Sequence, residues 1–305
     1  LLHGVIDSPD IPLNVSRSYL QSDANVKKIS TYITKKVADR LEEIFKEQRE
    51  QYEQKWDNIK LFIEYGMLSD EKFCERALKF ALLKNTDGKY FSLDEYRTAV
   101  EPQQTDKDKK VVLLYATDVE EQYQYIEAAK NKGYDVLLMD CELDAHFVGM
   151  LEQKMTDVRC ARVDSDSVDN LIPTGENVKP EMSEDDSKAL SELFKAVLPD
   201  GADYVVEARN LGEEGAPVVI TQSEFMRRYR EMSALGGGMN FYGQMPKAYN
   251  VIVNMENPLI HRIWDEKDKE SELLKQVCDL ALLGNGMLKG KALSDFIARS
   301  QSLLK

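Results

Sequence analysis

Apolar residues recur every three or four positions through most of the first hundred residues. Over residues 23–49 this spacing puts the apolar side chains on one side of a long predicted helix, and it continues through two further predicted helices, residues 50–65 and 69–83. The opening residues, 1–6, read instead as a short strand. We therefore expect residues 1–105 to form a mainly helical layer entered through one strand.

The pattern then changes to short apolar runs that alternate with helical stretches. Strands are predicted at residues 111–116, 136–139 and 158–163, with helices at 119–130 and 143–154 between them. This order implies a small, mainly parallel sheet with crossover helices over residues 106–165. No glycine-rich phosphate loop follows the first strand, and Asp118 and Glu120 at the start of the next predicted helix would repel phosphate. Nucleotide binding at this sheet is therefore not expected.

An acidic stretch that contains Pro173, Gly175 and Pro180 follows and predicts a linker over residues 166–183. Beyond it, residues 184–305 predict a mixed α+β domain. Its expected strands are 204–208, 217–221 and 249–253, and its expected helices are 184–197, 222–235, 258–265, 268–283 and 291–304. The fold class is thus a multidomain combination of α+β and α/β units that ends in helices.

Net charge limits the possible binding partners, and cysteine content indicates the redox compartment. The 305 residues carry a net charge of −14, which disfavours nucleic acid and anionic membranes as partners. No apolar run approaches the roughly 18 residues that a membrane-spanning helix needs. The four cysteines lie far apart in apolar contexts, which favours thiols in a reducing cytoplasm, and the three histidines are too scattered to indicate a metal site.

One ungapped motif is far more specific than these patterns. Residues 4–17 read Gly-Val-Ile-Asp-Ser-Pro-Asp-Ile-Pro-Leu-Asn-Val-Ser-Arg, and Leu20-Gln21 follow shortly after. This stretch closely resembles the signature of the ninety-kilodalton heat-shock chaperones, and the order of the predicted units agrees with that family along the rest of the chain. With no initiator Met, no acidic Met-Glu-Glu-Val-Asp ending and no retrieval signal, the chain resembles a fragment of a bacterial member, the high-temperature protein G branch. The resemblance implies the later middle segment plus the C-terminal dimerisation domain.

The resemblance implies a catalytic role for three residues of this motif. In the family, an arginine at the position of Arg17 reaches the γ-phosphate of ATP held with Mg by the N-terminal domain of the same chain, and Asn14 and Gln21 match the neighbouring catalytic-loop residues. The fragment itself is expected to bind no cofactor and to hydrolyse no ATP. The alternative to a catalytic role is that Arg17 forms ordinary ion pairs with nearby surface carboxylates. Ser18 stands where the family usually has Glu, which removes a local partner of Arg17.

A second candidate site is the amphipathic helix expected after residue 221. The resemblance implies that it touches client proteins through Phe225, Met226, Tyr229 and Met232, with Arg227, Arg228 and Arg230 turned elsewhere. The glycine run at 236–238 would let such a helix move. The alternative is an ordinary stripe that faces the core.

One further position can be compared with the family. His146, beside Phe147, stands where some bacterial members offer a client-contacting Trp, and a partly buried packing residue is the favoured interpretation here.

The last two helices carry more apolar positions than one chain would cover, so the resemblance favours a homodimer. The expected interface residues are Leu273, Val277, Leu280, Leu293, Phe296, Ile297 and Leu304. Packing wholly within the chain is the alternative.

These expectations describe a fragment of a cytoplasmic, ATP-driven chaperone clamp that acts on unfolded or partly folded clients. Two rival hypotheses remain. A dimeric protein-binding scaffold would lack any ATPase partner. An independent enzyme at the sheet would have to use Asp118, Asp140 and Glu142, which include no nucleophile–base pair.

Overall fold

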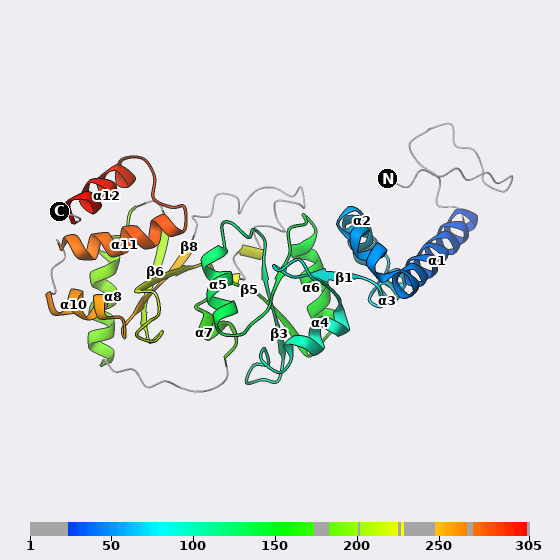
Figure 1. The fold of residues 1–305 in the computed structure, drawn as a ribbon, viewed down its shortest axis with the longest axis horizontal. Helices are drawn as coiled ribbons and strands as arrows, with labels where there is room; N and C mark the ends of the chain where they lie inside the picture. The colour runs from blue at the N-terminus through cyan, green and yellow to red at the C-terminus, as the bar shows by residue number, and fades with distance from the viewer. Residues whose placement is uncertain are drawn as a thin grey trace. The chain divides into compact units, whose positions relative to one another are not determined.

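The computed structural model of this chain describes residues 24–173, 183–200, 202–224, 227–228, 248–266 and 271–303 (Figure 1). The chain divides into two units, each described below by itself. The first comprises the described residues up to Leu82 together with Tyr90–Leu93, and the second comprises Leu83–Lys89 and the described residues from Asp94 onward. No helix in the described ranges is long and apolar enough to cross a bilayer.

Three helices make up most of the first unit: α1 (Ala24–Glu47), α2 (Arg49–Ser69) and α3 (Glu71–Ala77). The side chain of Asp70 caps α3 by accepting the N–H of Phe73 at 2.9 Å, which satisfies a donor that the helix leaves free. Their buried apolar side chains include Tyr52, Trp56 and Ile63. In α1, however, Ala38 is the one buried residue among the described side chains and Ile33 of the expected apolar stripe is 38% exposed, so the spacing predicted these helices better than it predicted their buried positions.

The helix expected over residues 69–83 is too long. It ends at Ala77, and β1 (Leu82–Lys84) pairs with β2 (Tyr90–Ser92) in a two-stranded sheet that the sequence analysis did not predict. The reason lies in the turn that follows β1. The side-chain oxygen of Asn85 accepts the N–H groups of Asp87 and Lys89, at 3.1 and 2.9 Å, and Gly88 takes φ +77°. The helix α4 (Leu93–Val100) comes next.

A three-stranded parallel sheet forms the first part of the second unit, as the sequence predicted. Its strands β3 (Val111–Ala116), β4 (Val136–Leu138) and β5 (Val158–Arg162) lie in the order β4-β3-β5, with Leu113 opposite Cys160. Every residue of β3 is buried, as expected for the central strand of a covered parallel sheet. The crossover helices are α5 (Tyr123–Asn131) and α6 (Asp144–Lys154).

Helix α5 begins four residues later than predicted. The carboxylate of Asp118 accepts the N–H groups of Glu120 and Glu121, at 2.8 and 2.9 Å, and the side-chain oxygen of Gln122 accepts two more backbone N–H groups. These bonds give residues 117–122 a turn instead of a first helical turn.

The first residues of the expected linker are packed. Helix α7 (Val168–Leu171) lies in this stretch, and Leu171 and Ile172 are buried against the residues of the parallel sheet. Their apolar side chains outweigh the acidic composition around them. Residues 174–182 lie outside the described ranges.

The C-terminal part begins with α8 (Glu184–Lys195) and contains β6 (Asp203–Arg209), β7 (Val218–Thr221) and β8 (Ala248–Asn254). The strand order is β6-β8-β7, with β6 parallel and β7 antiparallel to β8, so the two consecutive strands do not pair with each other. Helices α10 (Pro258–Glu266), α11 (Glu272–Gly284) and α12 (Gly290–Leu303) share one apolar core with this sheet and α8. The chain is therefore a mixture of helices and sheets, as predicted.

Two helical glycines form a matched test of packing. A Cβ at Gly66 in α2 would lie 2.7 Å from Cε1 of the buried Phe73 ring, whereas a Cβ at Gly149 in α6 would meet nothing within 4 Å. Both changes to Ala remove backbone freedom, which stabilises a helix by about 0.5–1 kcal/mol. We expect Gly149→Ala to raise the free energy of unfolding by that amount, and Gly66→Ala to lower it by about 1–3 kcal/mol because the ring must move. Urea unfolding of both variants checks this, and an equal gain from both would contradict the close packing of α2 on α3.

Candidate functional site

Most of the residues expected to touch other molecules lie outside the described ranges. These are the catalytic-loop residues Asn14, Arg17 and Gln21, the client-contact residues Phe225, Met226, Tyr229 and Met232, and Leu304 of the expected dimer face. The described neighbours Glu224, Arg227 and Arg228 do show how the start of the segment that was expected to contact clients is held.

Glu224 joins this segment to the parallel sheet. Its Oε1 accepts a hydrogen bond from the Tyr115 hydroxyl at 2.7 Å, and its Oε2 accepts the backbone N–H of Arg162 at 3.2 Å. Just before it, the N–H of Gln222 donates to the carbonyl of Asp164 at 3.0 Å. Strands β3 and β5 therefore fix the point from which the segment departs.

Arg227 and Arg228 both contact the same carboxylate. Arg227 Nη2 lies 2.8 Å from Glu224 Oε1 and 2.6 Å from the Tyr115 hydroxyl, and its guanidinium carbon is 5.7 Å from the centre of the Tyr115 ring. Arg228 donates through Nε to the same Oε1. One carboxylate and two guanidinium groups thus meet beside a tyrosine.

Arg228 also reaches the helix that covers the sheet. Its Nη1 lies 2.7 Å from Glu152 Oε2 in α6, and its Nη2 donates to the carbonyl of Cys160 in β5 at 2.9 Å. Glu152 in turn accepts the backbone N–H of Cys160 at 2.8 Å. We call Tyr115, Glu152, Glu224, Arg227 and Arg228 the arginine cluster.

Charge and burial both act within the arginine cluster. Burial alone would raise the pKa of Glu224, but the nearby guanidinium groups of Arg227 and Arg228 outweigh that effect and lower it. For Tyr115, burial is the largest effect and raises the pKa of the hydroxyl well above its ordinary value. The carboxylate therefore stays ionised and the phenol stays neutral, which suits both to these hydrogen bonds.

The sequence analysis missed this role. It placed Arg227 and Arg228 only as residues turned away from the methionine face, whereas Arg227 is buried and 4% exposed. Glu224 stands three and four positions before the two arginines, a spacing that favours ion pairs on a helix and was the available signal.

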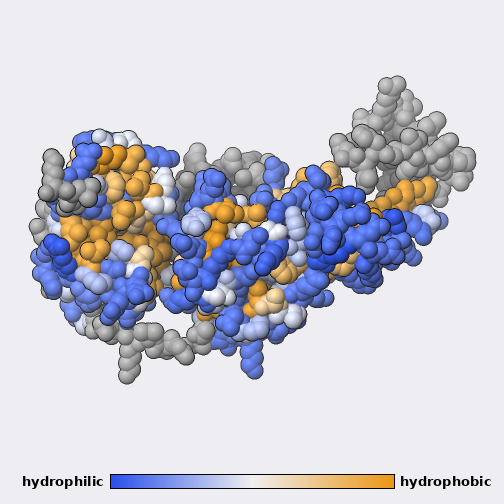
Figure 2. Space-filling model, viewed as in Figure 1, coloured by the Kyte–Doolittle hydropathy of each residue, from blue (hydrophilic) through white to orange (hydrophobic). Residues whose placement is uncertain are grey.

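The expected dimer residues in the last two helices divide by exposure. Val277 and Phe296 are buried in the chain's own core, and Leu273 and Leu293 are partly buried against it. By contrast, Leu280 is 54% exposed and Ile297 is 47% exposed. Leu283 is exposed as well, at 37%, and Figure 2 shows an apolar area over these helices. We call Leu280, Leu283 and Ile297 the C-terminal apolar face.

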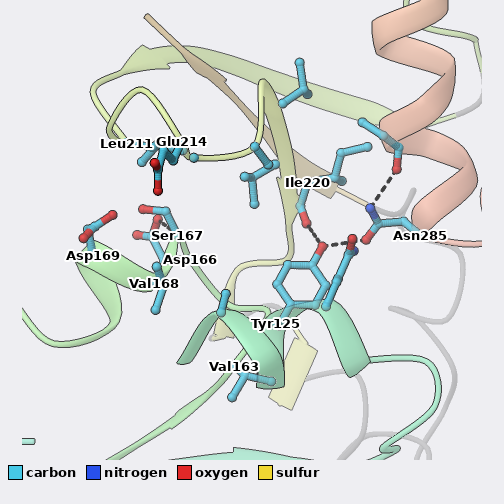
Figure 3. Close-up of a pocket in the computed structure, with 17 residues that line it drawn as sticks. Tyr125, Val163, Asp166, Ser167, Val168, Asp169, Leu211, Glu214, Ile220 and Asn285 are labelled. Carbon is cyan, nitrogen blue, oxygen red and sulfur yellow. Dashed lines mark hydrogen bonds between the residues drawn. The ribbon is translucent and has the colours of Figure 1, made fainter. Parts of the chain in front are cut away.

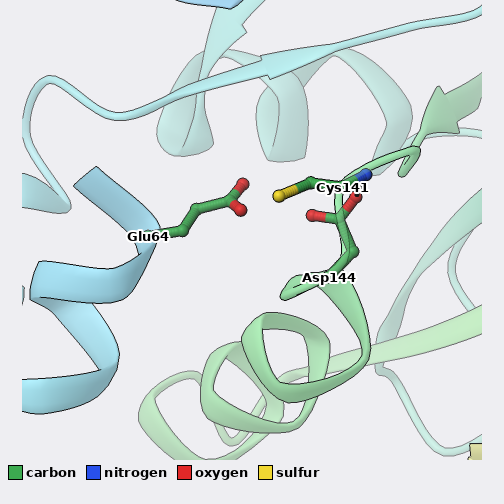
Figure 4. A group of neighbouring side chains, drawn as sticks. All are labelled: Glu64, Cys141 and Asp144. Atoms are coloured by element: carbon green, nitrogen blue, oxygen red, sulfur yellow. Dashed lines mark hydrogen bonds between the residues drawn. The ribbon is translucent and has the colours of Figure 1, made fainter. Parts of the chain in front are cut away.

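The start of α6 fixes the position of His146. The Asp144 carboxylate accepts the backbone N–H of Cys141 at 2.7 Å in the turn where the helix begins, and Figure 4 shows both residues there. His146 is half-buried on this helix and Phe147 is buried.

Comparison with known proteins identifies the family. The sequence profile described as Hsp90 protein matches residues 1–299, which is nearly the whole chain. The chain belongs to this family.

Individual relatives agree with that assignment. The chain is 47% identical over 372 aligned residues to the chaperone protein HtpG of Porphyromonas gingivalis and 45% identical to that of Bacteroides fragilis, in each case across 100% of this chain. A more distant relative, the chaperone protein HtpG of Treponema denticola, is 27% identical across 99% of this chain. The chain spans about half the length of the first two relatives, 54% and 55%.

The ionised state of Glu224 gives a testable pH dependence. Its pKa lies below the ordinary value of 4.5, so the stability that it contributes is complete above pH 4.5 and is lost as the pH falls through the lowered pKa. We expect Glu224→Gln to lower the free energy of unfolding by about 1–3 kcal/mol at neutral pH, because two guanidinium groups lose their shared charge partner. The difference from the parent should shrink below pH 4.5.

Denaturant unfolding of both proteins from pH 7 to pH 3 measures this difference. Glu192→Gln in α8 is the control, because that side chain is exposed and forms no ion pair with another described residue, so its replacement should leave the free energy of unfolding nearly unchanged. A difference for Glu224→Gln that stays constant across the pH range would contradict an ionic role.

Proposed function

We propose that this chain is the part of an ATP-driven chaperone that completes the ATPase site of another domain, contacts clients and joins two copies. The observation that carries the proposal is the match of essentially the whole chain to the Hsp90 family, with chaperones named HtpG among its relatives. The whole protein would act in the bacterial cytoplasm and bind ATP with Mg in its N-terminal domain.

In this proposal Arg17 supplies positive charge to the γ-phosphate, with Asn14 and Gln21 beside it. A guanidinium contributed from outside the nucleotide pocket stabilises the negative charge that develops during phosphoryl transfer. The chain alone would then hydrolyse no ATP. Its contribution depends on presenting the arginine to the domain that holds the nucleotide.

The client contacts are proposed for Phe225, Met226, Tyr229 and Met232. The arginine cluster supports this role because it holds the start of the segment firmly on β3 and β5. Methionine and aromatic side chains beyond that point would present a surface that adapts to many unfolded sequences.

Dimerisation is proposed through the C-terminal apolar face. Leu280, Leu283 and Ile297 are large apolar side chains exposed on α11 and α12. Arg299 pairs with Asp279 and hydrogen-bonds Gln276 at 2.8 Å, so the two helices are already fixed to each other. A second copy that packs on this face would remove the exposed apolar surface from water.

The catalytic proposal predicts a large loss of activity from one substitution. In the complete protein, Arg17→Ala should reduce the ATPase rate by about 10³-fold or more, the scale of a removed arginine finger. Arg40→Ala is the matched control, because Arg40 is 60% exposed on α1 and forms only a surface pair with Glu43. An ATPase rate that survives Arg17→Ala would instead favour a scaffold without a catalytic contribution.

The dimer proposal predicts a change of mass. Sedimentation of the chain should give about twice 34.8 kDa, and Leu280→Glu with Ile297→Glu should return it to a monomer by placing charge in the interface. Leu259→Glu on α10, at a residue 42% exposed, is the control and should leave the dimer intact. A monomer at every concentration of the unaltered chain would contradict the proposal.

A further inference from the structure

A pocket lies apart from the arginine cluster and the C-terminal apolar face, and none of the expected site residues lines it. It has a volume of about 270 Å³ and is formed by α5, residues 163–169, the turn at 211–216, strand β7 and helix α11 (Figure 3). Residues from two sheets therefore contribute to one cavity.

One side of the pocket is apolar and well fixed. Val163, Val218 and Ile220 line it and are 1%, 7% and 3% exposed. The Tyr125 hydroxyl donates to the backbone carbonyl of Ile220 and lies 2.6 Å from Asn285 Oδ1. Burial raises the pKa of Tyr125, so its hydroxyl stays neutral. The hydrogen bond of this hydroxyl therefore links α5 to β7 on this side of the pocket.

The other side carries negative charge and a buried hydroxyl. Ser167 is 3% exposed, and its Oγ has no hydrogen-bond partner among the described residues. Asp166 is paired with Arg209 at 2.7 Å, and Asp169 is paired with Lys132. The Glu214 carboxylate forms no ion pair in the described part of the chain, and Figure 3 shows it directed toward Asp166 and Ser167. A buried hydroxyl without a partner is costly unless a ligand or water satisfies it.

The turn that carries Glu214 is held in place before any ligand arrives. Asn254, which is fully buried at the end of β8, accepts the N–H of Leu211 at 3.0 Å and donates to the carbonyl of Gly212 at 2.8 Å. Asn257 donates to the carbonyl of Gly215 at 2.8 Å. A fixed wall reduces the conformational entropy that a ligand would otherwise have to offset.

We propose that this pocket binds a small amphipathic amine. The apolar part of the ligand would pack against Val163, Val218 and Ile220, and its ammonium group would donate to Glu214 and to the Oγ of Ser167. The Glu214 carboxylate, which has no cationic partner among the described residues, favours a cation and repels an anion, whereas Asp166 and Asp169 are already balanced by Arg209 and Lys132. Because its walls come from the segment 125–169 and from the segment 211–285, a bound amine stabilises the packing of the two sheets.

Titration calorimetry with phenethylammonium chloride tests the proposal on the unaltered chain. We expect one saturable site, with 2-phenylethanol bound about tenfold more weakly because it lacks the charge, and 3-phenylpropionate not bound. The three ligands share a phenyl ring on a short carbon chain and differ in their head groups. Comparing their affinities therefore separates the contribution of ligand charge from that of apolar surface.

Two neighbouring glutamates give a matched pair of variants. Glu214→Gln should weaken the amine about five- to tenfold, whereas Glu213→Gln should leave its affinity unchanged, because Glu213 is exposed on the same turn and does not line the pocket. Ala128→Phe, which fills the cavity from α5, should abolish binding.

Three results would overturn the proposal. The first is a binding curve that does not saturate up to about 10 mM amine, a concentration well above the dissociation constant of a specific site. The second is equal weakening by Glu213→Gln and Glu214→Gln, which would mean attraction to the acidic surface alone. The third is full binding by Ala128→Phe while its thermal unfolding remains that of the parent.

Discussion

The attachment of Glu224, Arg227 and Arg228 to the parallel sheet centres on one carboxylate, which accepts hydrogen bonds from three side chains and one backbone N–H. Glu224 receives hydrogen bonds from Tyr115 in β3 and from Arg227 and Arg228 in its own segment. Tyr115 and Arg162 belong to the parallel sheet, so this carboxylate joins the chain that follows β7 to it, and the pair of Arg228 with Glu152 adds a second ionic connection through α6. Because the charges are partly screened from water, removing one of them leaves the others without compensation, so the cluster behaves as a unit.

The sequence could predict the elements whose patterns are local. The helices of the first unit and the parallel order of β4-β3-β5 follow from the spacing of apolar residues and from the alternation of strand and helix. It could not predict that the helix expected up to residue 83 ends at Ala77, or that α5 begins only after the turn at Asp118, where side chains bond to the backbone and override a helical pattern. Nor could it place β8 between β6 and β7, because that pairing depends on contacts distant in the sequence.

The same contrast holds for the candidate site. Exposure of Leu280 and Ile297 agrees with the apolar excess of the last helices, but Val277 and Phe296 belong to the chain's own core. The spacing alone could not separate these two sets, since both lie on the same pair of helices. Likewise, the partner of Arg228 in α6 is 76 residues away, and no local pattern points to it. The signature at residues 4–17 pointed to the family because it is a run of particular residue types. A spacing of apolar positions alone is shared by many unrelated proteins.

The position of β8 in its sheet has a consequence for synthesis of the chain. Strands β6 and β7 emerge from the ribosome first, yet among the described strands each bonds only to β8, which begins at Ala248. Until that strand is made, both present open edges to the surrounding solution. Pairing of β6 and β7 into one sheet must therefore wait until residues 222–247, and β8 after them, have been translated.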